Sequence, residues 1–143
     1  MEIRPFQPAD EAAVIALWER CGLVRSWNDP RKDIRRKRRV QPELFLVGVA
    51  GGAVVATAMA GYDGHRGWVY YLGVDPGHRR RSYGRRLLDE VERLLRQLGC
   101  PKINLQVRGD NRAAAEFYRR IGFTQDDVIS FGKRLIPDEQ GEA

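Results

Sequence analysis

Five arginines surround the start of one amphipathic helix, in the segment HRRRSYGRRLLDEVERLL at residues 78–95. A helix N-terminus carries about half a positive charge and leaves backbone N–H donors unpaired, so cations are disfavoured there. A bound phosphate removes both penalties, because it accepts from the free N–H groups and pairs with the arginines. The pattern therefore predicts a polyphosphate site at this strand–loop–helix junction. A solvated basic patch and a contact to nucleic-acid phosphates are the alternatives.

Two common phosphate-binding loops are excluded. The sequence contains neither G-x-x-x-x-G-K-[ST] nor G-x-G-x-x-G after a predicted strand. It therefore indicates neither a P-loop nucleotide-binding protein nor a dinucleotide-binding fold.

The composition is that of one soluble globular domain covering residues 1–143, with 43% hydrophobic and 31% charged residues and a net charge of +6. No apolar run approaches the roughly 18 residues that span a bilayer, and the N-terminus lacks the apolar stretch of a secretory signal. We therefore expect a cytoplasmic protein with no membrane contact. Cys21 and Cys100 suit neither a disulfide framework nor a metal site, so no metal is expected.

The elements that must position the arginines follow from periodicity and turn residues. A strand at 1–6 precedes helices at 7–22 and 30–40, three strands lie within 43–74, and a strand at 102–107 follows the arginine-rich helix. A helix at 110–122 and a strand at 126–135 close the chain. This βααβββαβαβ order predicts an α/β (α+β) fold with a mixed sheet, antiparallel at first and parallel where the last helix crosses over.

Two motifs in this frame resemble the GCN5-related N-acetyltransferase (GNAT) family. Residues 79–84, RRRSYG, align with its acetyl-CoA motif [QR]-x-x-G-x-[GA], and residues 111–123, NRAAAEFYRRIGF, match N-x-x-A-x-x-[FY]-Y-x-x-x-G-[FY] at every specified place. Ser82 departs from the usual glycine. If its φ is positive, the serine costs about 1–2 kcal/mol, although its hydroxyl can donate to a phosphate oxygen.

The resemblance implies a single GNAT domain with a mixed sheet of about six or seven strands and about four helices, whose splayed central strands form the acetyl-CoA slot. It also implies which residues bind acetyl-CoA. These are Leu72, Gly73, Val74, Arg79, Arg80, Arg81, Ser82, Tyr83, Gly84, Arg85, Asn111, Ala114, Phe117 and Tyr118.

The implied reaction is direct transfer of an acetyl group from acetyl-CoA to a primary amine. Tyr118 matches the family's general acid, and it shares one helical stripe with Asn111 and Ala114. From the residues alone, a core tyrosine with a satisfied hydroxyl is the alternative. The backbone N–H groups of Gly73 and Val74 are the candidate oxyanion donors, since a glycine there suits a bulge or a close approach.

The base and the acceptor are less defined by the sequence. Asp63 and His65, in the predicted turn GYDGHRG, are candidates for a base or a water relay. Trp27, Asn28 and Asp29 are candidates for the acceptor side, and Asp29 can equally cap the helix that follows.

The expected partner is a small-molecule or peptide amine, and nucleic acid is not expected because Tyr83 is the one aromatic residue within the arginine run. A homodimer is compatible with a free edge strand. The alternatives are a basic nucleic-acid-binding module and an inactive CoA-binding protein of GNAT-like fold.

Overall fold

The computed structural model describes residues 1–138 and contains one five-stranded mixed sheet in the order β1-β2-β3-β4-β5. The first four strands are antiparallel neighbours, and β5 runs parallel to β4. The strands are β1 (Glu2–Pro5), β2 (Phe45–Ala50), β3 (Ala53–Tyr62), β4 (Gly67–Val74) and β5 (Ile103–Leu105). The helices are α1 (Glu11–Arg20), α2 (Pro30–Lys37), α3 (Tyr83–Gln97) and α4 (Arg112–Arg120).

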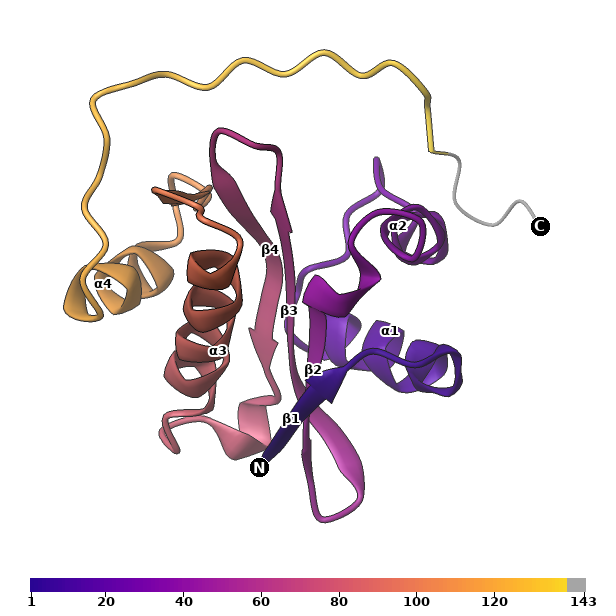
Figure 1. Ribbon diagram of the computed structural model, residues 1–143. Coiled ribbons are helices and arrows are strands. Elements are labelled where there is room, and N and C mark those ends of the chain that lie inside the picture. The colour runs from indigo at the N-terminus through magenta and orange to yellow at the C-terminus, as the bar shows by residue number, and fades with distance from the viewer. Residues whose placement is uncertain (139–143) are drawn as a thin grey trace.

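The helices cover the two faces of the sheet, with α1 and α2 on one side and α3 and α4 on the other (Figure 1). Each face has its own core, because neighbouring residues of a strand point to opposite faces. Phe45 and Val47 of β2 pack with Val14 and Trp18 of α1. The second core lies under α3, and its buried members are Leu44, Leu46, Ala56, Ala58, Ala60, Val69, Leu87, Leu88, Val91 and Leu95.

The apolar face predicted for the arginine-rich helix is confirmed, since Leu87, Val91 and Leu95 are almost fully buried on α3. This face fixes the helix against the sheet. The arginines at the helix start are therefore held at the end of β4, which is connected to them by residues 75–82.

The predicted closing strand at residues 126–135 is wrong for the chain as the structure describes it. No strand lies after α4 within residues 121–138, so the sheet has five strands rather than the expected six or seven. Residues 124–138 instead run extended from α4 across the molecule toward α2 (Figure 1). The residues have strand-like composition, but their backbone makes no hydrogen bond to a strand of the described chain.

None of the helices within residues 1–138 is long and apolar enough to cross a membrane. The same described residues contain no group of three His, Cys, Asp or Glu side chains placed to hold a metal ion. The single-domain prediction covered residues 1–143, and its last five residues lie outside the described part.

Candidate active site

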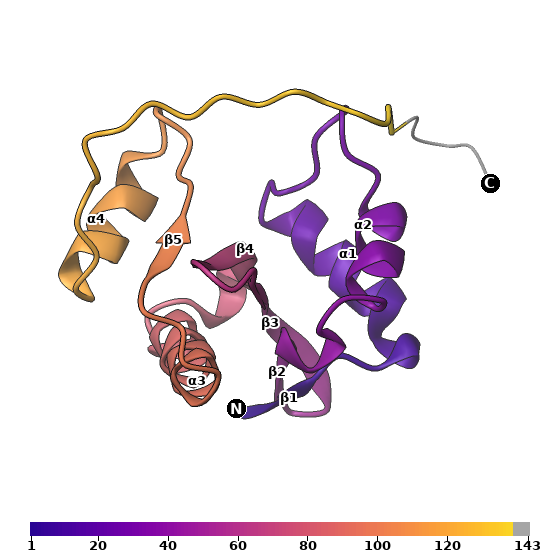
Figure 2. The same cartoon turned by 45° about the horizontal axis from the view of Figure 1, so that its top comes forward.

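A gap opens between β4 and β5, because the two strands pair over only three positions. Gly67, Trp68 and Val69 pair with residues 103–105, after which β5 ends while β4 continues to Val74. Figure 2 shows β5 and α4 diverging from the sheet here. The edge of β4 over residues 70–74 that faces away from β3 therefore has no strand beside it. Its N–H and C=O groups are available to an extended ligand.

A β-bulge lies at the start of this unpaired stretch. Met59 of β3 faces Tyr70, whereas Thr57 faces Gly73, so β4 carries one extra residue between the two pairs. Tyr71 has φ of 51°, an uncommon conformation for a non-glycine residue. A bulge bends its strand and redirects the backbone groups that follow.

A buried hydrogen-bond chain holds the bulge in place. The Trp18 indole donates to the Thr57 hydroxyl over 2.9 Å, and that hydroxyl donates to the carbonyl oxygen of Tyr71 over 2.8 Å. The rings of Trp18 and Tyr71 also stack, with centroids 3.8 Å apart. Sequence reasoning missed this group. The one signal for it was a threonine within the otherwise apolar segment VVATAMA.

Gly73 is required by packing on the α1 side of β4. A Cβ atom at Gly73 would lie 3.1 Å from Cδ1 of Leu23 and 3.4 Å from Sγ of Cys21. Cys21 in turn donates to the carbonyl of Val74 over 3.3 Å, and burial raises the pKa of its thiol. The α1 side of this stretch is therefore closed, and a ligand approaches β4 from the β5 side.

The arginine loop has the backbone geometry that a close ligand requires. Arg80 and Ser82 have φ of 65° and 60°, and Ser82 precedes the first residue of α3 without a side-chain capping bond. Two non-glycine residues in the left-handed region cost about 1–2 kcal/mol each, so the loop is strained. The sequence-based condition on Ser82, a positive φ, is met.

The first turn of α3 supplies the donors of this loop. Arg86 is the first residue whose N–H bonds back to Ser82. The N–H groups of Tyr83, Gly84 and Arg85 therefore lack intrahelical acceptors. The side chains of Arg79, Arg80, Arg81 and Arg85 are exposed around them. Backbone donors and arginines thus meet at one point, as the sequence predicted.

Gly84 lies in a closely packed position at the start of α3. A Cβ atom at Gly84 would lie 3.3 Å from the ring of Phe117 and 3.6 Å from Val74 Cγ2. The small residue therefore lets α3, α4 and β4 meet. Phe117 packs against the core under α3, so its ring supports the slot from inside the fold.

Tyr118 lies on α4 in an aromatic cluster. Its ring makes edge contacts with Phe117 at 5.2 Å and with Phe123 at 5.6 Å between centroids. Burial raises the pKa of its hydroxyl to about 12. The side chain therefore remains protonated at neutral pH, as a hydrogen-bond donor must.

Asn111 acts as the N-cap of α4. Its side-chain oxygen accepts from the N–H of Ala114 over 3.1 Å. The sequence predicts Asp110 or Asn111 as this cap, and the structure has Asn111 in that place. Its contact with a cofactor arm stays a prediction. Ala114 remains a small, half-buried residue on the same helix stripe as Tyr118.

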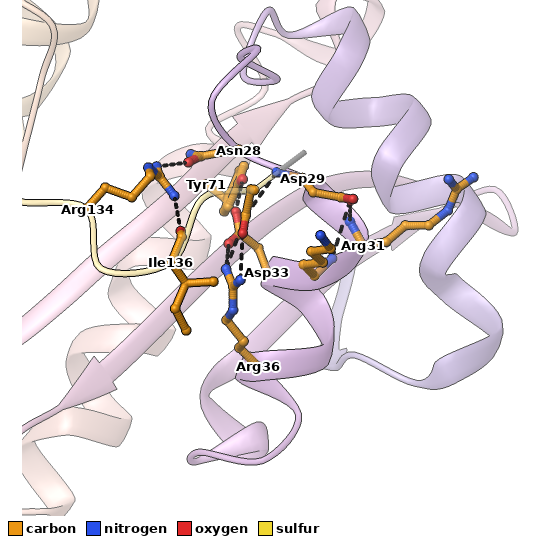
Figure 3. Close-up of polar contacts among 10 residues, drawn as sticks. Asn28, Asp29, Arg31, Asp33, Arg36, Tyr71, Arg134 and Ile136 are labelled. Carbon is orange, nitrogen blue, oxygen red and sulfur yellow. Dashed lines mark hydrogen bonds and ion pairs between the residues drawn. The ribbon is translucent and has the colours of Figure 1, made fainter. Parts of the chain in front are cut away.

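On the other side of β4, a polar network joins α2 to the bulge (Figure 3). The Tyr71 hydroxyl donates to Asp33 Oδ2 over 2.5 Å. Burial raises the pKa of the Asp33 carboxyl despite this hydrogen bond. Sequence reasoning missed Asp33, because nothing in the basic segment PRKDIRRKRRV distinguishes it from a solvated helix residue.

The C-terminal segment reaches this network. The Arg36 guanidinium donates to both carboxylate oxygens of Asp138 over 2.6 and 3.1 Å. This pairing holds the pKa of Asp138 at about 2. Arg134 donates to the side-chain oxygen of Asn28 over 2.8 Å, as drawn in Figure 3.

The three predicted acceptor-side residues lie together beside this network but make different contacts. Asp29 caps α2 by accepting from the N–H groups of Arg31 and Lys32, so its alternative role, helix capping, is the one the structure contains. Trp27 is half-exposed, and the Arg108 guanidinium lies 5.2 Å from its ring centroid. This contact bridges the loop before α2 and the loop after β5.

Asp63 and His65 do not join the site. Asp63 accepts from the N–H groups of His65 and Arg66, which stabilises the β3–β4 turn and lowers the pKa of the carboxyl. Leu72 lies six positions after Arg66 along β4, or roughly 20 Å of strand. Their predicted role as a base or water relay is therefore not supported.

A family model described as the acetyltransferase (GNAT) family matches residues 11–123. An acetyltransferase of Sodalis glossinidius is 52% identical over 141 residues, covering 98% of this chain and 99% of that protein. An acetyltransferase of Yersinia enterocolitica is 50% identical over 140 residues, again covering 98% and 99%.

Solved structures share the fold. Ard1 from Thermoplasma volcanium has a TM-score of 0.77 at 29% identity, covering 86% of this chain and 82% of its own. The enzyme AAC(6')-Iy, solved with the bisubstrate analogue CoA-S-monomethyl-acetylneamine, has a TM-score of 0.76 at 17% identity and covers 93% and 97%. The second likeness is evidence for the fold alone.

Proposed function

Because this chain belongs to the GNAT acetyltransferase family, we propose that it transfers an acetyl group from acetyl-CoA directly to a primary amine of a small molecule or peptide. The observation that carries the proposal is the unpaired edge of β4 over residues 70–74, which leads directly into the arginine loop. An extended arm with a pyrophosphate at one end matches this arrangement. The family model and the acetyltransferases at about 50% identity support acetyl-CoA as the donor.

The pantetheine arm pairs with β4 as an extra strand would. Leu72, Gly73 and Val74 supply those of their backbone groups that point away from β3, since β5 does not extend beside them. Ala114 and Phe117 of α4 form the opposite wall.

The pyrophosphate lies at the start of α3. The N–H groups of Tyr83, Gly84 and Arg85 donate to it, and the Ser82 hydroxyl adds another donor. The surrounding arginines, which the bare helix disfavours, are then paired with negative charge. They are Arg79, Arg80, Arg81 and Arg85.

The acetyl carbon lies at the bulge, where attack by a neutral amine creates an oxyanion. The candidate oxyanion donors are the N–H groups of Gly73 and Val74, which point to opposite edges of β4 because the two residues are consecutive in register with β3. The one that faces the open edge stabilises this charge from backbone that the bulge has already oriented. Tyr118 donates a hydrogen bond to the departing sulfur. A thiol has a pKa near 8.5, well below the value of about 12 for Tyr118, so complete proton transfer from the phenol is uphill. Tyr118 therefore acts mainly as a hydrogen-bond donor. The proton that balances the departing thiolate comes from the nitrogen of the acceptor, which is neutral when it attacks and becomes an ammonium in the tetrahedral intermediate.

The acceptor amine approaches from the α2 side, between Trp27, Asn28 and Tyr71. Asp33 is the carboxylate that faces Tyr71, and burial raises its pKa, which makes the carboxylate a stronger proton acceptor than an exposed aspartate. An α-amine, with a pKa of about 7.7–8.0, needs little help to become neutral. A small-molecule or peptide α-amine is therefore the acceptor that this site serves best. We also propose that the chain forms a homodimer, whose interface is derived below.

The test of the donor is thermal stabilisation. Acetyl-CoA and CoA at tenfold excess over their Kd raise the melting temperature, whereas ATP and NAD at equal concentration change it little. Equal stabilisation by ATP would leave only a polyanion site and favour the nucleic-acid-binding alternative.

The test of the reaction is release of free CoA thiol from acetyl-CoA in the presence of a panel of amines and N-terminal peptides. Turnover with at least one amine supports the enzyme. Stabilisation by CoA without turnover on any amine would favour the inactive CoA-binding alternative.

A further inference from the structure

The segment after α4 exposes more apolar surface than any other part of the described chain. Val128, Ile129 and Phe131 are 76%, 80% and 88% exposed, and Leu135 and Ile136 are also largely exposed. Residues 124–138 make no backbone–backbone hydrogen bond to any other described residue. An extended apolar segment with unpaired N–H and C=O groups is a template for pairing with another strand.

The first half of this segment runs beside β5 and in the same direction. Lys102 pairs with Asp126 over 2.8 Å, and Gln106 donates to Ser130 over 2.6 Å. In each pair the two residues are 24 positions apart in the sequence, so residues 126–130 follow residues 102–106 in a constant register. Figures 1 and 2 agree that α4 forms the crossover between the two segments. The far edge of the segment faces no other element.

The charges of the segment are complementary to its own reverse. The sequence DDVISFGKRL begins with Asp126 and Asp127, and Lys133 and Arg134 follow at equal distances beyond Ser130. In an antiparallel pair of two identical strands centred on Ser130, residue 127 faces residue 133 and residue 126 faces residue 134. Acidic residues thus face basic residues at both ends of the pair.

The apolar residues fit the same register. Ile129 faces Phe131 of the other strand twice, which gives two aromatic–aliphatic pairs on one face. Val128 faces Gly132, and Ser130 faces its own copy. A shift of one residue would keep only one acidic–basic pair at each end and would no longer place Ile129 opposite Phe131.

We propose that a second copy of this chain pairs with the segment, forming an antiparallel two-stranded ribbon of residues 126–134 about a two-fold axis at Ser130. The ribbon is isologous, as in most homodimers. A free two-stranded ribbon is marginal in water, but each strand here is supported by β5 of its own copy through the contacts at Lys102 and Gln106. The dimer thus supplies the backbone pairing that this segment lacks within the described part of a single chain.

The pattern favours a second copy over an unrelated chain, because the complementarity lies within a single sequence. The segment's own chain cannot supply the pairing strand. Its two ends are held apart, at Lys102 on one side and at Arg36 on the other.

A charge-exchange experiment tests the ribbon. Wild-type protein sediments as a dimer at micromolar concentration. Asp127→Lys alone and Lys133→Glu alone each place like charges opposite each other twice and weaken the dimer at least tenfold. Mixing the two variants restores attraction at both sites and yields a heterodimer as tight as the wild-type dimer. Glu19→Lys, an exposed charge reversal on α1, is the matched control and stays dimeric.

A crosslinking experiment tests the register independently of charge. Directly opposed residues of an antiparallel pair have Cα atoms about 4.5–5.5 Å apart, within the range of a disulfide. Ser130→Cys therefore gives a covalent dimer on mild oxidation, whereas the two cysteines of Val128→Cys lie about 13 Å apart and give none. A monomeric wild-type protein, two dimeric single charge variants, or equal crosslinking by Val128→Cys would each overturn the proposal. A monomeric protein would still show a higher melting temperature with acetyl-CoA. Failure of the dimer proposal can therefore be distinguished from failure of the proposed acetyltransferase function.

Discussion

The Thr57 hydroxyl lies 2.8 Å from the carbonyl oxygen of Tyr71, and this contact fixes the point where β4 leaves regular pairing. Thr57 is fully buried, and its hydroxyl also accepts from the Trp18 indole. One side chain thus satisfies a buried donor and a buried acceptor at a position of unusual backbone geometry. The bulge that orients the candidate oxyanion donors depends on a residue that touches no substrate.

Replacing Thr57 with valine tests this relationship. Thr57→Val keeps the shape but leaves the Trp18 N–H and the Tyr71 carbonyl unpaired, so the free energy of unfolding falls by about 1–3 kcal/mol. The kcat of the variant falls, and its KM for acetyl-CoA changes less, because the oxyanion donors lose their support. Denaturant unfolding and initial rates provide the two measurements. Thr57→Ser retains the hydroxyl and serves as the control, and a valine variant with wild-type kcat would show that the bulge holds without this bond.

Tyr118→Phe tests the proposed donor to the leaving sulfur. Its pKa of about 12 makes Tyr118 a hydrogen-bond donor rather than a full acid, so we expect kcat to fall roughly ten- to a hundredfold, at the lower end of acid catalysis. The KM for acetyl-CoA changes little, since the ring contacts with Phe117 and Phe123 remain. Steady-state rates with a chemistry-limited amine give the result. An unchanged kcat under those conditions means that the sulfur departs unassisted.

Asp33→Asn tests the proton acceptor. The asparagine oxygen can still accept from the Tyr71 hydroxyl, so the fold persists while the charge and the basicity are lost. We expect kcat/KM for the amine to fall about a hundredfold and its rise with pH to shift, with the KM for acetyl-CoA unchanged. Asp63→Asn is the matched control, because Asp63 only stabilises the β3–β4 turn. Equal pH profiles for the two variants would remove Asp33 from the mechanism.

The pH dependence of stability tests the contact between Asp138 and Arg36. The folded-state pKa of Asp138, about 2, lies below its ordinary value of 3.8, so its charged form stabilises the fold. This contribution is complete above about pH 5 and is lost as the pH falls from near 4 toward 2. Asp33 acts with the opposite sign, because burial raises its pKa and its protonated form is favoured by folding.

The corresponding measurement is the difference in unfolding free energy between wild type and Asp138→Asn at several pH values. The difference is constant from pH 7 to pH 5 and shrinks below pH 4. A difference independent of pH between 5 and 3 would show that the ion pair does not stabilise the fold.

Local patterns predicted the elements that carry the binding loop. The leucine spacing located α3, and the motif NRAAAEFYRRIGF located α4 with Asn111 at its cap. These signals lie within a few residues of one another and follow from helix periodicity and capping.

The contacts that organise the centre of the site could not be predicted from the sequence. Thr57 and Tyr71 are 14 residues apart, and Asp33 and Tyr71 are 38 residues apart, so no local period connects them. The segment at 126–135 has the composition of a strand, but a strand also needs a neighbour. Composition does not say whether that neighbour belongs to the same chain.

The Ser82 side chain has two effects that substitutions can separate: its Cβ strains the backbone, and its hydroxyl is a hydrogen-bond donor. Its φ of 60° strains the apo protein, and its hydroxyl makes no capping bond within α3. Ser82→Gly therefore keeps or raises the melting temperature without ligand, since glycine adopts this conformation at low cost. If the hydroxyl donates to a phosphate oxygen, the same change weakens CoA binding by about 1–2 kcal/mol. Ser82→Ala retains the Cβ and removes only the hydroxyl, so equal losses of affinity in both variants identify the hydroxyl as the cause.

Gly84→Val weakens binding further and lowers stability, because its Cβ meets the Phe117 ring and forces α4 away from α3. Calorimetry of CoA binding to the four proteins at fixed salt makes the comparison. Tighter binding by Ser82→Gly with no change in Ser82→Ala would show instead that the Cβ obstructs the pyrophosphate.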